Sequence, residues 1–388
     1  MSVRTEFEMN AESIEPELKG FLSNHQTSKK IIDIEIEPKT VYFEDARNGL
    51  NLNFDFILKN LTEPRFIIRF LKVAVYDSSG RLITFRHLNH NGVGTPSIHT
   101  IGKFEMAGKE TIDIFNPFHQ FPKDMPIDYL RYMFTFLDTA EKKEYYYGNI
   151  IVRPLLYAQQ TKLSLPLRGI LTILDGHDFY SHHRRFAMSI VRKVTENKFK
   201  SNFSRFGLDF TIIGSDGNTR RMKPEEYRKN YDFHFEDARR FYTDGADVLA
   251  PAKGEVVACV NDLDDLYDSK FDLDDAVKED KIEEIAGNYL VIKHNDREFS
   301  HLFHLKKDSI LVTLGEKVER GQTVGKVGFS GASTTYSHLH YQLMDGPDFL
   351  VDNPLPVKFS DVTLLIGSKK RKFDTLALDT GDLMISND

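Results

Sequence analysis

Two histidines separated by a single residue are the strongest candidates for chemistry in this sequence. On a β-strand successive side chains point to opposite faces, so His338, His340 and Gln342 would share one face. The alternate residues of the segment HLHYQL are apolar or aromatic, and they predict a core face. Neutral imidazole is the commonest protein ligand for metal ions and the usual general base near neutral pH. We therefore expect a metal or acid–base site on the histidine face.

A stretch punctuated by glycines leads into these histidines and separates short apolar runs, as in tight turns between short strands. With the histidines it resembles the C-terminal half of the lysostaphin-type, or LytM-type, zinc metallopeptidases. Their pattern is a Gly-x-x-Val-x-x-Gly-Gln-x-x-Gly hairpin, then Gly-x-Ser/Thr-Gly, then His-Leu-His on a strand. The matching residues are Gly315, Val318, Gly321, Gln322, Gly325, Gly328, Ser330, Gly331, His338, Leu339 and His340.

Two further segments extend the resemblance to about residues 167–359. Residues 245–260 match the family's Gly-x-x-Val-x-Ala-Pro-Ala-x-Gly-x-Val strand pair. Residues 287–305 are similar to its Gly-Asn-x-Val-x-Ile-x-His strand and its Tyr-x-His-Leu strand. The resemblance implies that His301 is the third active-site histidine, whereas His294 and His304 are interpreted as strand-end or surface residues.

The first metal-binding segment of the family, His-x-Gly-x-Asp, is altered here to RFGLD, with Arg205 in place of histidine and Asp209 retained. Arginine is permanently charged and cannot bind zinc. A subset of the family has a Ser-His pair followed by Arg-Tyr-Ala-x-Asp-Phe, and Ser181-His182 upstream of RFGLDF is similar to it. The missing imidazole would then come from His182 or its neighbour His183. In an extended segment the two would point to opposite faces, so only one could serve.

A competing first ligand lies in the segment NYDFHFEDARR. His234 would share a strand face with Glu236 or a helix face with Asp237. We favour a short solvated helix for FEDARRFY, because Asp209 has the better local context.

The resemblance therefore implies a zinc ion held by His182 or His183, together with Asp209 and His340. It also implies that His301 and His338 are catalytic. One would take a proton from the attacking water, and the other would stabilise the oxyanion and protonate the leaving amine.

The implied reaction is hydrolysis of a peptide bond in a bacterial peptidoglycan cross-link of the cell wall, or in a glycine-rich peptide. Two alternatives stay open. The first, supported by Arg205, is a metal-free binding or regulatory module with the same fold. The second is a structural assembly protein that makes contacts through its N-terminal part and uses the peptidase-like domain as a spacer. Zinc content separates the enzyme from both.

The N-terminal half must be a different kind of domain. Residues 31–156 contain short runs rich in Ile, Val, Phe and Tyr, bounded by turn signals, and predict an antiparallel β-sandwich that serves as a scaffold or interaction module. Its histidines are expected to be ordinary surface or loop residues; they are His87, His90, His99 and His119.

The whole chain is thus predicted to be mainly β. A polar segment (1–30) precedes the β-sandwich, and an antiparallel peptidase domain of the LytM type follows it (157–360), with a duplicated hybrid motif or barrel-sandwich-like sheet. A charged tail (361–388) would end the chain. Between the strands of the second domain, the carboxylates of residues 261–284 lack the ligand order of a calcium-binding loop and predict a solvated insertion.

Composition sets further bounds on partners and location. The net charge of −7 argues against a general nucleic-acid binder, and the single cysteine excludes an internal disulfide framework. The N-terminus has no apolar segment of the signal-peptide type, and no apolar run is long enough to span a bilayer. The default expectation is therefore a cytoplasmic location, unless another route exports the protein.

Overall fold

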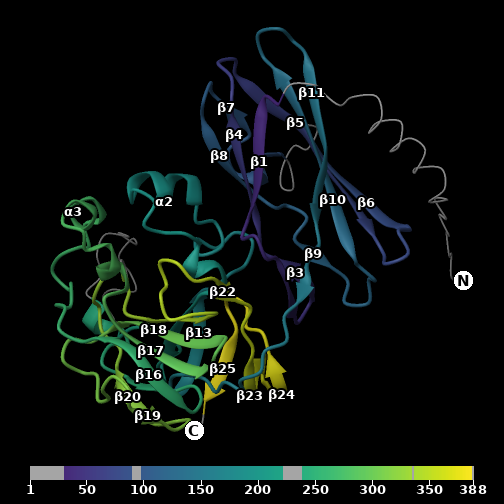
Figure 1. Cartoon of the computed structure of the whole chain (residues 1–388). Helices are drawn as coiled ribbons and strands as arrows, with labels where there is room; N and C mark the ends of the chain where they lie inside the picture. Colours follow the sequence, from purple (N-terminus) through teal and green to yellow (C-terminus); the bar gives the residue numbers. More distant parts are fainter. Residues whose placement is uncertain (1–29, 90–97, 222–237, 334–335, 387–388) are drawn as a thin grey trace, which may run out of the picture. The chain divides into compact units, whose positions relative to one another are not determined.

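The computed structural model describes residues 30–89, 98–221, 238–333 and 336–386. They form two compact units, of which the first comprises the described residues from 30 to 43 and from 49 to 155. The second comprises residues 44–48 and everything from residue 156 onward. Residues 1–29 of the predicted polar segment 1–30, His90 and the competing ligand His234 lie outside the described residues. Figure 1 traces the strands of both units.

The first unit is built from two antiparallel sheets. One has the order β1-β4-β8, and the other has the order β11-β10-β5-β6 with β7 paired to β5. A short pair, β3 with β9, and a 3-10 helix, η1, complete it. The bounds are β1 Ile32–Glu37, β3 Gly49–Leu52, β4 Asp55–Asn60, β5 Phe66–Tyr76, β6 Leu82–Asn89, η1 Ile98–Ile101, β7 Glu105–Met106, β8 Thr111–Phe115, β9 Gln120–Phe121, β10 Tyr129–Asp138 and β11 Glu144–Val152.

Side-chain alternation explains why these sheets form a sandwich. Phe56 of β4 and Phe134 of β10 are fully buried, and their rings meet edge to face with centroids 5.1 Å apart. Tyr132 of β10 contacts Phe56 in the same way at 5.0 Å. One continuous hydrophobic core thus joins the inner faces of both sheets, as expected for an aligned sandwich.

The second unit contains one large antiparallel sheet in the order β19-β16-β17-β18-β21-β14-β13-β25-β23-β24, with β22 paired to β21. A separate two-stranded sheet pairs β15 with β20, which lie between strands of the large sheet along the chain. The bounds are β13 Gly169–Asp175, β14 Leu208–Ile213, β15 Asp247–Leu249, β16 Gly254–Val260, β17 Asn288–Asn295, β18 Glu298–Leu305, β19 Lys317–Val318, β20 Thr323–Lys326, β21 Leu339–Met344, β22 Pro354–Leu355, β23 Phe359–Ile366, β24 Lys369–Leu376 and β25 Leu383–Ser386.

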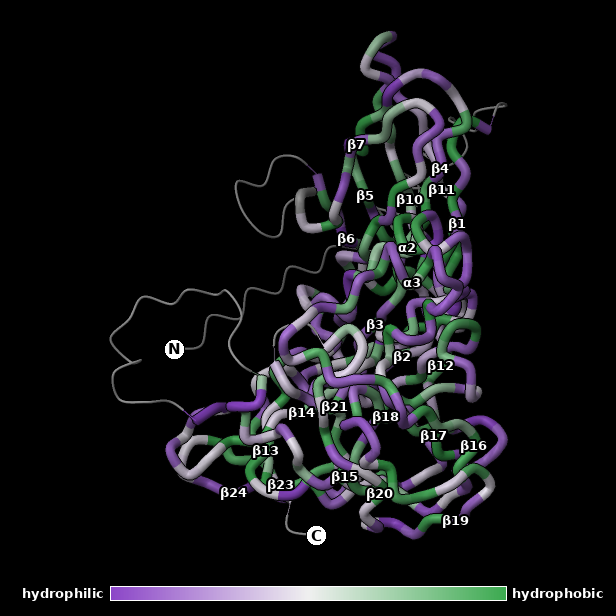
Figure 2. Tube along the Cα trace, turned by 90° about the vertical axis from the view of Figure 1, so that its left-hand side faces the viewer, coloured by the Kyte–Doolittle hydropathy of each residue, from purple (hydrophilic) through white to green (hydrophobic). Residues whose placement is uncertain are grey.

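The remaining elements are short. The helices are α2 Met188–Val194 and α3 Leu273–Lys278, and the 3-10 helices are η2 Phe203–Phe206, η4 Ala238–Arg240 and η5 Ile282–Ala286. Two strands, β2 Tyr42–Ala46 and β12 Leu155–Leu156, include points at which the chain passes from one unit to the other. Hydrophobic residues concentrate along the strands of each unit, whereas the loops are mostly hydrophilic (Figure 2). None of the helices in the described residues is long and apolar enough to cross a membrane. The prediction of a mainly β chain is confirmed.

The residues predicted as a C-terminal tail require a correction. The structure places β23, β24 and β25 in the large sheet, and β25 pairs with both β13 and β23. Strand β24 is exposed along most of its length and begins with the run Lys369–Lys372, which is why its sequence looked like a solvated tail.

A buried glutamate fixes the beginning of the second unit. Glu298, at the start of β18, is 1% exposed and accepts hydrogen bonds from the Tyr157 hydroxyl (2.8 Å) and from the backbone N–H groups of Gln160 and Thr161 (both 2.7 Å). The Asn295 amide donates a fourth hydrogen bond at 2.8 Å. The carboxylate thereby joins residues 157–161 to β18, the strand that carries the candidate histidine His301.

Candidate metal centre

Strand register brings the first two site residues together. Asp209 of β14 lies directly opposite His340 of β21, so both side chains project from the same face of the sheet. The His340 Nδ1 lies 3.0 Å from Asp209 Oδ1. On its other side, the His340 Nε2 donates to Gln342 Oε1 at 2.9 Å, which leaves Nδ1 as the nitrogen able to bind a metal. Both residues are buried.

Gly207 makes room for the imidazole of His340. A Cβ at position 207 would lie 2.8 Å from His340 Cε1 and 3.1 Å from Nε2, closer than real Cβ contacts. The backbone of Gly207, with φ −67° and ψ 151°, is one that any residue adopts. The glycine is therefore required by the close approach of the ring.

His183 is the third member of the cluster. Its Nδ1 donates to the Gly176 carbonyl at 3.0 Å, which leaves Nε2 facing Asp209 Oδ1 at 3.5 Å. Its ring centroid is 4.8 Å from that of His340. One donor atom from each of His183, Asp209 and His340 lies within 4.8 Å of the others, and all three residues are buried.

His182, the alternative first ligand, is exposed and forms an ion pair with Asp175. The expectation that His182 and His183 point to opposite faces is corrected, because their segment is a series of turns and their ring centroids are only 4.3 Å apart. Arg205 itself lies in η2, and its side chain is buried.

The electrostatics of the cluster fit a metal centre. Burial alone would raise the pKa of Asp209, but the imidazoles of His338, His183 and His340 outweigh it and hold that pKa well below its usual range. Burial lowers the pKa of His183 to about 4. The carboxylate is thus ionised and the imidazole neutral at pH 7, and these are the protonation states that bind Zn²⁺. The donor set therefore fits zinc.

His338 and Tyr336 approach Asp209 from the segment before β21. The His338 Nδ1 donates to the Tyr336 carbonyl at 2.9 Å, and its Nε2 lies 3.4 Å from Asp209 Oδ1. Burial lowers the pKa of His338, so its Nε2 carries a free lone pair at neutral pH. The Tyr336 hydroxyl donates to the second carboxylate oxygen, Asp209 Oδ2, at 3.0 Å.

The structure brings His304, rather than His301, against this cluster. The His304 ring lies 5.0 Å from that of His338 and 6.1 Å from that of His340, and its Nδ1 donates to the Ser330 carbonyl at 2.9 Å. His301 is fully buried, and its Nε2 is hydrogen-bonded to the Gly346 carbonyl at 3.0 Å. Strand alternation would put His304 on the far face, but its φ of +62° breaks the alternation.

Sequence reasoning therefore missed His304 and Tyr336 as members of the cluster. His301 and His304 are both followed by leucine, so the His-Leu signal occurs twice, three residues apart, in the segment FSHLFHL. No signal in the sequence pointed to Tyr336.

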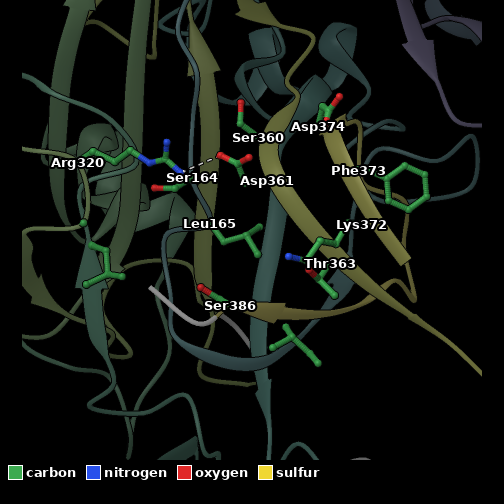
Figure 3. Close-up of a pocket in the computed structure, with 13 residues that line it drawn as sticks. Ser164, Leu165, Arg320, Ser360, Asp361, Thr363, Lys372, Phe373, Asp374 and Ser386 are labelled. Carbon is green, nitrogen blue, oxygen red and sulfur yellow. Dashed lines mark hydrogen bonds and ion pairs between the residues drawn. The ribbon is translucent and has the colours of Figure 1, made fainter. Parts of the chain in front are cut away.

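A separate pocket of about 430 Å³ lies at the far end of the large sheet, beside β23 and β24 (Figure 3). Arg320, Asp361 and Lys372 are among its lining residues, and Arg320 forms an ion pair with Asp361 at 3.4 Å. No histidine lines this pocket. This pocket is therefore distinct from the histidine cluster around Asp209.

Comparisons with known proteins match part of the chain. Residues 239–350 match the model of Peptidase family M23. Peptidoglycan DD-endopeptidase ShyC of Vibrio cholerae is 30% identical over 175 residues, which are 45% of this chain and 34% of ShyC. Peptidoglycan DD-endopeptidase ShyA of the same species is 48% identical over 59 residues, which are 15% of this chain and 13% of ShyA.

A solved structure of LytU is 25% identical and covers 28% of this chain and 61% of LytU, with a TM-score of 0.21 that carries no argument by itself. This chain spans about a third of the length of ShyC in their match. The matched region 239–350 contains β18 and β21, and with them His304, His338 and His340. The C-terminal half of this chain therefore contains a domain of peptidase family M23.

Proposed function

We propose that the second unit is a zinc-dependent metalloendopeptidase that hydrolyses peptide bonds in peptidoglycan cross-links or glycine-rich peptides. The observation that carries the proposal is the convergence of three buried imidazole rings on one ionised carboxylate oxygen, Asp209 Oδ1. The peptidase family M23 match supports it, and so do the names of ShyC and ShyA as peptidoglycan DD-endopeptidases. The cytoplasmic location expected from the N-terminal sequence stays a prediction.

His183, Asp209 and His340 would hold the zinc ion. When bound, zinc supplies Lewis-acid activation of water and of a carbonyl group at neutral pH. The protein contributes orientation: the Gly176 carbonyl fixes His183 and the Gln342 amide oxygen fixes His340, each through the nitrogen that does not face Asp209.

His338 and His304 would perform the proton transfers. Each donates its Nδ1 hydrogen to a backbone carbonyl, so each presents an unprotonated Nε2 as a general base. Burial lowers the pKa of His304 well below its usual range, so this imidazole is neutral at pH 7. In this assignment His304 takes the role that the family resemblance had given to His301, because the Nε2 of His301 is hydrogen-bonded to Gly346.

Alanine variants of three histidines test these roles. We expect His338→Ala and His304→Ala to retain zinc and to hydrolyse a peptidoglycan-type peptide about 10²–10⁴-fold more slowly, the usual contribution of general acid–base catalysis. His301→Ala is the matched control, since it removes a buried imidazole from the same strand as His304. Loss of zinc from His304→Ala, or a loss of activity confined to His301→Ala, would contradict the assignment.

The second candidate function is a metal-free binding or regulatory module. Its support is Arg205, which stands where the family has a histidine and is 1% exposed. Metal analysis separates the two functions, because the enzyme should bind a zinc ion at the site formed by His183, Asp209 and His340, and the module none. His340→Ala is the control that should abolish binding.

A further inference from the structure

A second acidic residue extends the row of side chains that contains Asp209 and His340. Asp175 ends β13 directly opposite Asp209, which lies opposite His340 on the next strand. The register reaches this alignment through a β-bulge between Ile173 and Asp175, because an unbroken ladder would place Leu174 opposite Asp209. The bulge therefore replaces an apolar neighbour of Asp209 with a carboxylate, as bulges beside functional sites commonly re-aim side chains.

Two carboxylates directly opposite each other on paired strands repel. Such a pair is stabilised when positive charge lies against it, and a metal ion bound through imidazoles supplies positive charge that the neutral imidazoles themselves lack. The groups that contact these two carboxylates include histidines: His182 pairs with Asp175, and three imidazoles face Asp209. Histidine and aspartate are also ligands for the same divalent metal ions.

The donor atoms fall into two sets. Asp175, His182 and His183 each offer one donor within 4.8 Å of the others, and so do His183, Asp209 and His340. A catalytic zinc ion takes three protein ligands and keeps a fourth position open, whereas the two sets together contain five residues, so one ion cannot take both sets. The free nitrogen of His183 faces Asp209, which assigns His183 to the inner set.

We propose that Asp175 and His182 bind a second transition-metal ion of the zinc class, at the exposed edge of the inner site. The proposal rests on the proposed function, because the inner site must hold its own ion. An imidazole with a carboxylate suits zinc-like ions, whereas calcium prefers ligands made only of oxygen. The outer ion has two protein ligands, and His182 is exposed, so its remaining ligands are water and its binding is the weaker of the two.

Equilibrium dialysis of the full chain against stepped concentrations of free Zn²⁺, followed by metal analysis, tests the proposal. The wild-type chain should bind one ion at low zinc and a second at higher zinc. His182→Ala and Asp175→Asn should retain the first ion and bind the second at least tenfold more weakly. Asp178→Asn is the matched control, because Asp178 is an exposed carboxylate of the same segment outside both donor sets.

Each result bears on one of the two proposals. A single ion in the wild-type chain at every zinc concentration would overturn the second site, as would a second ion that both variants retain unchanged. Loss of both ions from His182→Ala would show one shared centre; it would also overturn the second site but leave the proposed function intact. A wild-type chain that binds no zinc would overturn the proposed function, and the second site with it.

Discussion

Replacement of Gly207 by alanine should damage the metal centre without damaging the fold. The new Cβ would lie 2.8 Å from His340 Cε1, whereas carbon atoms in contact are about 3.5–4.0 Å apart. The ring must therefore move by roughly 0.7 Å or more. Metal–ligand distances tolerate deviations of only about 0.2 Å, so a displaced His340 cannot keep its bond length to a shared ion. We expect zinc affinity to fall at least tenfold, about 1.4 kcal/mol.

The assay compares Gly207→Ala with Gly325→Ala by zinc dialysis and by thermal unfolding of the metal-free protein. Gly325 of β20 is the matched control, because the nearest atom to an added Cβ there is 3.6 Å away, which is an ordinary contact. The metal-free Gly207→Ala chain should lose no more than about 1–3 kcal/mol, the usual cost of overpacking.

Two results would refute this reasoning about Gly207. Unchanged zinc affinity would mean that His340 is not a ligand or that its ring moves without cost. An equal loss of affinity in Gly325→Ala would mean that the effect comes from glycine replacement in general rather than from the contact with His340.

Three other perturbations have expected outcomes. Tyr336→Phe removes the donor to Asp209 Oδ2 and should weaken zinc binding about 10–100-fold in dialysis; unchanged affinity would show that the hydroxyl does not orient the carboxylate. Burial alone would lower the pKa of His177, but Glu44 outweighs it and raises that pKa to about 9. The stability from this pair, on the order of 3 kcal/mol, should be fully present below about pH 6.5 and lost as pH rises through about 9; equal unfolding free energies for the metal-free wild type and Glu44→Gln at pH 6 would contradict it. Phe56→Ala should cost about 3–5 kcal/mol in denaturant unfolding of the first unit and leave zinc affinity unchanged; a change in affinity would count against independent units.

Regular strands are the part of this site that sequence reasoning could predict. The two-residue period of a strand placed His338 and His340 on one face, and the resemblance of RFGLD to the family's His-x-Gly-x-Asp segment identified Asp209. The mainly β architecture followed from the same alternation. These features depend on local backbone geometry that a sequence pattern reports directly.

The residues that sequence reasoning misjudged lie where the backbone leaves that geometry. His304 reaches the cluster through a positive φ, and His182 and His183 lie in turns rather than in an extended segment. Asp175 aligns with Asp209 through a bulge. Most side chains of strand β24 are exposed and charged, so its sequence lacks the apolar alternation of a buried strand. The sequence therefore did not show that β24 pairs with β23. Each case depends on contacts between residues far apart in the sequence.

The hydrogen bonds of Glu298 also have a mechanical consequence. The chain passes into the second unit for the second time at residue 156, and three groups of residues 157–161 are held by this one carboxylate. A pulling force transmitted along the chain from the first unit would meet these bonds before it reached β13 and the turns that carry His183. Glu298 would therefore bear the tension at the start of β18, and the geometry of the metal centre would stay undisturbed.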